Sequence, residues 1–109
     1  MIPNSVRIFV CTEPQDMRRG FDGLALVARQ TLGIDPQSGV LICFVNKGLT
    51  RLKILWWDQN GYCILYKRMH RALVAMPPRD GESPSIKIDA RQLATMLAGV
   101  VHERRAKSA

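Results

Sequence analysis

The chain has 109 residues, 47% of them hydrophobic, and its 16 Lys and Arg against 9 Asp and Glu give a net charge of +7. This length suits a single domain with one core. Charged residues interrupt every apolar run before the roughly 20 residues that a membrane helix needs, so we expect a soluble, cytoplasmic protein. The excess cations lie after residue 45, where they could contact a polyanion or only aid solubility.

The first part of the chain predicts a strand followed by a helix. Residues 6–11 are rich in β-branched and aromatic side chains, which is typical of a strand. Over residues 24–32 apolar side chains recur at helical spacing, and Gly33 is suited to end the helix. We therefore expect a strand over residues 6–11 and a helix over residues 24–32.

The middle of the chain predicts a buried strand and a hairpin. Residues 40–45 form a continuous apolar run, and residues 51–57 and 62–66 form the two arms of the hairpin. The Asp-Gln-Asn-Gly sequence between the arms favours a tight turn, because Asn and Gly tolerate positive φ values. Alternation along residues 51–57 places Trp56 in the core and Trp57 on the opposite face.

The last part of the chain predicts two more strands and a helix. Residues 71–76 form a strand that two prolines close, and residues 85–88 alternate as an edge strand does. Asp89 is suited to cap a final helix, whose apolar face contains Leu93, Met96, Leu97 and Val100.

These elements predict an α+β fold. We expect a single domain over residues 1–103, built on a mostly antiparallel sheet. The N-terminal-half helix and the C-terminal helix would pack on it, both on one face. Residues 104–109 form a basic tail that we expect to be disordered.

The candidate catalytic groups have simpler structural interpretations. Cys11, Cys43 and Cys63 are widely spaced among apolar residues, which favours buried reduced thiols over a zinc site. The aspartates fall mostly at helix starts and in turns, whereas a nuclease needs carboxylates that converge on metal ions. The sequence also lacks a phosphate-binding glycine loop and a nucleophile motif. We therefore expect no enzymatic activity, no catalytic residue, no metal and no cofactor.

Cations alternate with flat rings along the predicted hairpin. This arrangement suits a surface that contacts phosphates and stacks on bases, although simple packing would also explain the rings. Trp57 shares its face with two of the cations, so we take it as the exposed ring. The predicted nucleic-acid-binding residues in and around the hairpin are Lys47, Arg51, Lys53, Trp57, Lys67, Arg68 and Arg71.

Two adjacent arginines, Arg18 and Arg19, precede the first predicted helix. Arginines near a helix start can bind phosphate oxygens, where backbone amides add to the positive field. They could equally pair with Asp16 and Asp22 and hold the turn in place. Both interpretations stay open, and we include the two arginines among the predicted nucleic-acid-binding residues.

Several of these segments together resemble a known family. They are the opening Met-Ile-Pro, residues 16–24, the turn at 35–39, residues 53–58 with Gly61, Tyr66-Lys67-Arg68, and the helix at 93–99. In them the chain is similar to the TnpB-type protein that the second open reading frame of sixty-six-family insertion sequences encodes. The resemblance covers nearly the whole chain, and its most specific parts are the arginine motif and the double tryptophan followed by Asp. It implies a bacterial protein that accompanies a separate, larger transposase and supports transposition.

Taken together, these features predict a non-catalytic accessory factor for transposition that contacts DNA through a basic hairpin surface. Such binding would be weakly sequence-specific and would fall steeply with added salt. The alternative is a protein-interaction module that docks on the transposase or another element-encoded subunit, with Trp57 as its anchor. A third hypothesis is a small metal-dependent nuclease that uses Asp22.

Overall fold

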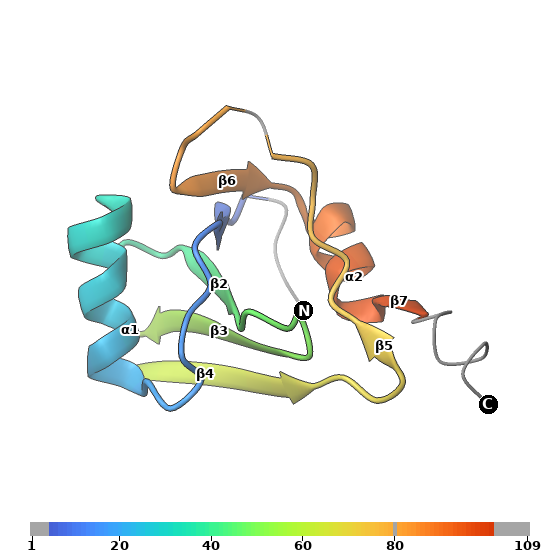
Figure 1. Ribbon diagram of the computed structural model, residues 1–109. Helices are drawn as coiled ribbons and strands as arrows, with labels where there is room; N and C mark the ends of the chain where they lie inside the picture. Colours follow the sequence, from blue (N-terminus) through green and yellow to red (C-terminus); the bar gives the residue numbers. More distant parts are fainter. Residues whose placement is uncertain (1–4, 80, 102–109) are drawn as a thin grey trace.

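A five-stranded sheet forms the centre of the molecule, with the strand order β4-β3-β2-β1-β6 (Figure 1). The computed structural model describes residues 5–79 and 81–101. The strands of this sheet are β1 (Ile8–Cys11), β2 (Leu41–Val45), β3 (Arg51–Asp58), β4 (Gly61–Arg68) and β6 (Ser85–Ile88). Only β1 and β2 are parallel, and the other neighbouring pairs of this sheet are antiparallel. The predicted α+β fold with a mostly antiparallel sheet is confirmed.

Two helical segments pack on this sheet. The first, α1 (Phe21–Val27), continues into a π-helical segment, η1 (Ala28–Leu32), and Gly33 ends it in the left-handed conformation with φ of 65°. The second helix is α2 (Ala90–Ala98). The α1 segment connects β1 to the parallel strand β2, since parallel neighbours need a crossover connection.

The two helices cover opposite faces of the sheet. On one face, Leu24 and Ala28 of the first helical segment pack in a cluster with Ile42, Phe44 and Leu55 of the sheet. On the other face, α2 packs against the sheet, and Figure 1 shows the helices on opposite sides. The expectation that both helices lie on one face was wrong, because β1, β2 and β3 carry apolar side chains in both directions. Strands with two apolar faces need cover on both.

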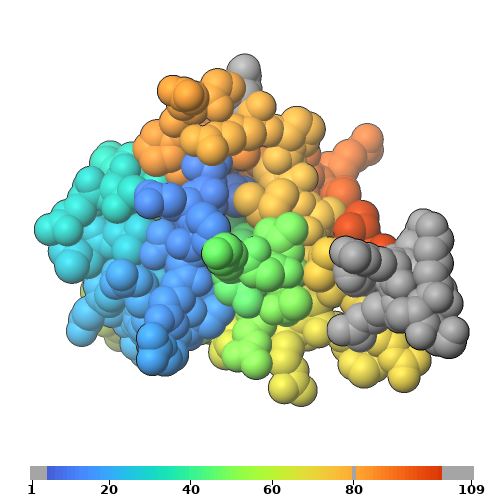
Figure 2. Space-filling model, viewed as in Figure 1, coloured from blue at the N-terminus to red at the C-terminus, as the bar shows by residue number. Residues whose placement is uncertain are grey.

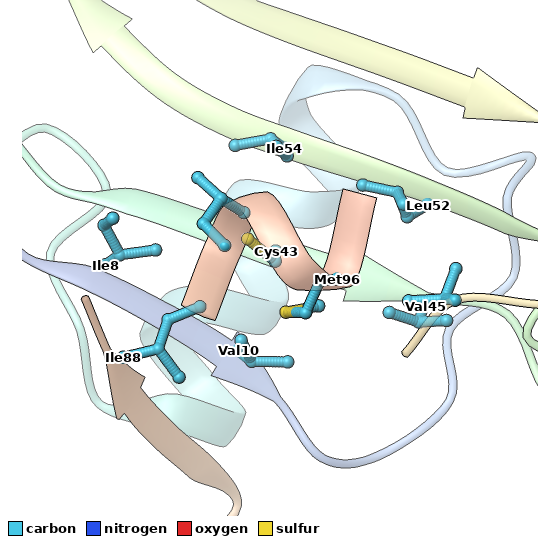
Figure 3. Close-up of a cluster of buried hydrophobic side chains, with 10 residues drawn as sticks. Ile8, Val10, Cys43, Val45, Leu52, Ile54, Ile88 and Met96 are labelled. Atoms are coloured by element: carbon cyan, nitrogen blue, oxygen red, sulfur yellow. The ribbon is translucent and has the colours of Figure 1, made fainter. Parts of the chain in front are cut away.

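Figure 3 shows the core beneath α2. Met96 of the helix lies over buried side chains from four strands, and Leu93 belongs to the same cluster. Asp89 begins the helix with a full capping box: its carboxylate accepts the Gln92 amide at 2.8 Å, and the Gln92 side chain accepts the Asp89 amide at 2.9 Å. The predicted helix cap is therefore confirmed.

The predicted hairpin is formed by β3 and β4, which pair along their full length from Arg51–Arg68 to Asp58–Gly61. The turn differs in detail, because the residue with positive φ is Gln59, at 49°, rather than Asn60 or Gly61. The edge strand predicted over residues 85–88 is also present, as β6 beside β1.

The structure corrects two predicted elements near the end of the chain. The strand predicted over residues 71–76 is reduced to β5 (Ala72–Leu73). It pairs with β7 (Val100–Val101), although we had expected Val100 on the final helix. Gly99 causes this difference, since its φ of 78° and ψ of 179° end the helix and return the chain as a strand.

The predicted basic tail, residues 104–109, lies outside the described residues. Within residues 5–79 and 81–101, none of the helices is both long and apolar enough to cross a lipid bilayer.

Candidate nucleic-acid interface

An open groove of about 880 Å³ lies between two loops and the start of the hairpin. One wall is the segment after β1, and the other is the loop that joins β2 to β3. Figure 2 shows these segments side by side, the first in blue and the second in green. Three cations and one aromatic ring line the groove: Arg18, Lys47, Arg51 and Tyr66. We call it the basic groove.

Hydrogen bonds fix both walls of the basic groove. The Gln15 amide donates to the Val45 carbonyl at 2.9 Å, which places the segment after β1 beside the end of β2. In the opposite wall, the Asn46 side-chain oxygen accepts the amides of Thr50 and Arg51, each at 2.9 Å. The Asn46 side chain thus closes a tight loop and leaves Lys47 exposed at its tip.

Arg18 is paired with Asp16 at the rim of the basic groove. The guanidinium donates to both carboxylate oxygens, with the shortest distance of 2.6 Å between Nη2 and Oδ2. The Arg18 side chain nevertheless stays 92% exposed. Its hydrogen bonds to the carboxylate lower the Asp16 pKa to about 2. The pair fixes the turn and still leaves the guanidinium open to solvent, so each of the two interpretations of Arg18 keeps some support.

Lys53 is buried beneath the basic groove, with only 9% of its surface exposed. Its ammonium donates to the carbonyls of Met17 and Arg19, at 2.7 and 2.8 Å. The same ammonium lies 4.8 Å from the centroid of the Tyr66 ring, within the range of a cation–π contact. Lys53 therefore anchors the arginine turn to the sheet, and its charge is directed at protein groups.

Arg51 and Arg68 form the open end of the hairpin. They are register partners across β3 and β4, and both are exposed. Like charges directly opposite each other destabilise a strand pair slightly. The Tyr66 hydroxyl accepts a hydrogen bond from Arg51 at 3.3 Å, and half of the Tyr66 surface is exposed. The result is two guanidiniums next to an accessible ring.

Most of these cations have no acidic partner in the described part of the chain. Within residues 5–79 and 81–101, the ion pair between Arg18 and Asp16 is the only one. Lys47, Arg51 and Arg68 are exposed without a carboxylate within ion-pair distance there. An uncompensated positive field of this kind attracts polyanions.

The structure brings together only part of the predicted nucleic-acid-binding set. Arg18, Lys47 and Arg51 line the basic groove, Arg68 is the cross-strand partner of Arg51, and the exposed Arg19 adjoins Arg18. Lys53 is buried below the groove, as described above. Two predicted cations lie elsewhere. Lys67 donates to the Leu97 carbonyl near the end of α2 at 2.6 Å, and Arg71 is exposed in the next loop with φ of 56°.

Trp57 lies far from the basic groove. It is six residues along β3 from Arg51, a separation of about 20 Å at the usual rise of a strand. Its ring is half-buried and meets the Tyr62 ring edge-on, with centroids 5.0 Å apart. Trp56 is half-buried on the opposite face, against the core beneath α2. The exposed ring beside the cations is Tyr66 instead.

Sequence reasoning treated Tyr66 only as one of several rings near the cations. The available signal was strand pairing, since a hairpin with a two-residue turn between Asp58 and Gly61 places residue 66 opposite residue 53. That register puts Tyr66 on the same face as Arg51, at the end that α1 does not cover.

The other candidate groups are the three cysteines and the carboxylates. Cys11 and Cys43 are buried free thiols as predicted, whereas Cys63, also predicted to be buried, is a free thiol that is only half-buried. Burial raises the Cys43 pKa to about 12. Among residues 5–79 and 81–101, no three His, Cys, Asp or Glu side chains come together as metal ligands would. Asp22 is exposed in the first turn of α1.

Comparison with known proteins gives the chain its family. The model of the family described as "IS66 Orf2 like protein" matches residues 6–107. Among curated relatives, "Uncharacterized protein y4hO" of Sinorhizobium fredii is 34% identical over 102 residues, which cover 92% of this chain and 87% of the relative. "Uncharacterized protein y4jC" of the same organism is 30% identical over 96 residues, covering 87% and 80%. No solved structure matches the chain. The chain therefore belongs to the IS66 Orf2-like family, whose setting is insertion-sequence transposition.

Proposed function

We propose that this protein is a non-catalytic accessory factor of transposition that contacts DNA phosphates through the basic groove. The observation that carries the proposal is the cluster of Arg18, Lys47, Arg51 and Arg68 around one open groove. Only Arg18 among them has an acidic partner within the described residues.

The chemistry of the groove favours phosphate contacts over base-specific recognition. Guanidinium groups bind phosphate oxygens in a bidentate manner, and Lys47 adds a point charge on an exposed loop. Phosphate contacts position a protein on DNA without carrying sequence information. We therefore expect weak sequence specificity and an affinity that falls as salt rises, with a slope of roughly −0.9 per phosphate contacted on duplex DNA.

The test is fluorescence anisotropy with duplex DNA from an end of the insertion sequence, at roughly 50 and 200 mM salt. The double variant Arg51→Gln with Arg68→Gln should bind more weakly at low salt and should lower the salt slope by roughly one for each lost contact. The matched control is Lys87→Gln with Arg91→Gln. It removes the same charge from exposed positions on α2 and on β6, which is the edge of the sheet opposite β4.

The two double variants distinguish binding in the basic groove from binding that depends only on the net charge of the protein. Under the proposal, the control keeps nearly the wild-type slope, while the variant at Arg51 and Arg68 has a smaller slope. Equal losses in both would show that net charge alone drives binding, and no binding at low salt would refute the proposal.

A second candidate function is docking on the transposase or another element-encoded subunit. The observation in its favour is a set of exposed apolar side chains at the end of the described chain, where Val100 and Val101 are 52% and 75% exposed. Trp57 is a weaker anchor than expected, because its ring packs against Tyr62. Co-purification with the transposase after nuclease treatment tests this function, and Val101→Ser should weaken the association. Val6→Ser, which changes a partly buried side chain packed against the core, serves as a folding control.

A further inference from the structure

We propose that the basic groove binds single-stranded DNA, with one base stacked on the Tyr66 ring. This inference rests on the proposed function and narrows it to one form of the nucleic acid. It is carried by the juxtaposition of the exposed, hydrogen-bonded Tyr66 ring with Lys47 and Arg51, two groove cations that have no acidic partner within the described residues.

The Tyr66 ring is held in place from two sides. Its hydroxyl accepts a hydrogen bond from Arg51, and the buried Lys53 ammonium lies 4.8 Å from its centroid. Lys53 is itself fixed by two carbonyls, so the ring rests on a rigid support. Half of the Tyr66 surface is nevertheless exposed to solvent. A flat ring that is already ordered loses little entropy when a base stacks on it.

The exposed Tyr66 ring favours a single strand over a duplex. In a duplex the bases are stacked on one another inside the helix, so their flat faces cannot reach a ring on a protein surface. The unpaired bases of a single strand are free to stack on this ring.

The polar groups of the groove lie where a single strand needs them. Arg18 and Lys47 come from opposite walls, and Arg51 lies next to the ring. Cations that follow a backbone, combined with an aromatic side chain on a strand, are the usual elements of single-strand binding. Such binding tolerates any sequence, because every base has a flat face.

The test compares a short oligodeoxythymidylate with a duplex of the same length by anisotropy at low salt. We expect the wild-type protein to prefer the single strand. Tyr66→Leu should weaken single-strand binding by about fivefold or more, since base stacking on a ring commonly contributes that much. Duplex binding should stay unchanged in this variant. Tyr66→Phe and Tyr66→Trp keep a ring and should retain the preference.

A second measurement does not depend on affinity. Photo-crosslinking with an oligonucleotide that contains 5-iododeoxyuridine should label the peptide with Tyr66 in the wild type and lose that label in Tyr66→Leu. The control is Tyr62→Phe, a ring on the same strand whose hydroxyl is bonded to Arg29 and Gln37. A melting curve of each variant confirms that it is folded.

The outcomes separate this inference from the proposed function. If the duplex binds as tightly as the single strand, or if Tyr66→Leu affects both equally or neither, the inference is overturned and the phosphate-contacting function stands. If a matching RNA strand binds more tightly than the DNA strand, the assignment to DNA is overturned. If none of the nucleic acids binds, both proposals fail.

Discussion

Lys53→Met should destabilise the protein far more than the loss of a surface lysine does. Methionine keeps a long, unbranched side chain in the buried space but has no ammonium. The change therefore removes the hydrogen bonds to the Met17 and Arg19 carbonyls and the contact with the Tyr66 ring. Both carbonyls belong to the turn that carries Arg18, so the wall of the basic groove loses its anchor.

The size of the effect follows from these contacts. Hydrogen bonds to a charged group contribute about 1.5–3 kcal/mol each, so two contribute roughly 3–6 kcal/mol. Methionine recovers part of this, because it avoids the cost of keeping a buried ammonium out of water. We expect a net loss of about 2–4 kcal/mol. At an unfolding entropy of about 2.1 cal/mol/K per residue, this lowers the Tm of the 109-residue chain by roughly 9–17 °C.

The assay is thermal unfolding followed by circular dichroism, together with urea titration to verify that the m value is unchanged. Lys47→Met is the matched control, because Lys47 is exposed at the loop tip and should cost no more than about 0.5 kcal/mol. If Lys53→Met and Lys47→Met lower the Tm equally, the anchoring role assigned to the buried ammonium is refuted.

Three further predictions concern charge, thiol chemistry and backbone conformation. Asp16→Asn frees the Arg18 guanidinium and removes a negative charge from the groove rim, so DNA should bind about threefold more tightly at low salt, as anisotropy would show. Burial holds the Cys43 pKa near 12, so in Ellman's assay at neutral pH Cys43 should react only after unfolding, whereas the half-buried Cys63 reacts earlier. Because the unfolded thiol ionises at lower pH, its contribution to stability is complete below the unfolded pKa and is lost as the pH rises towards 12. Gly99→Ala should cost about 2 kcal/mol or more, because φ of 78° is unfavourable for alanine and its Cβ would lie 2.7 Å from the Leu73 carbonyl oxygen.

Each of these predictions has a control in the same chain. Asp22→Asn removes an exposed charge that does not line the groove, and an equal gain in affinity there would contradict the role of Asp16. Rapid labelling of Cys43 in the folded protein would contradict its burial. Gly20→Ala places a methyl group in open space without positive φ, and a loss as large as that of Gly99→Ala would contradict the backbone argument.

The elements with strong local signals could be predicted from the sequence. Alternation and a short turn identified the β3–β4 hairpin, and a polar residue before an apolar periodic run identified the Asp89 cap. The β5–β7 pair could not be predicted, because two-residue strands have no periodicity of their own and depend on partners far along the chain. The helical spacing of apolar residues also predicted Val100 on the final helix, but Gly99 ends that helix and Val100 lies in β7.

The sequence identified the residues of the candidate site better than it predicted where they lie relative to one another. The cations of residues 46–68 were identified, but their distribution depends on which end of the sheet α1 covers, and this is set by packing between distant segments. Lys53 shows the difficulty: alternation gives its face correctly, whereas its burial results from the turn at Met17–Arg19 folding over it. Trp57 was predicted to be the exposed aromatic contact. Its ring instead packs edge-on against Tyr62, at the end of β3 away from Arg51.

The position of β1 in the sheet has a consequence for how the protein is made. This strand lies between β2 and β6, and Ile8 pairs with Ile88, which is synthesised near the end of the described chain. Until β6 has left the ribosome, β1 can pair with β2 on one side only. The nascent polypeptide therefore carries an open strand edge until β6 emerges, so this sheet is completed only after most of the described chain has been translated.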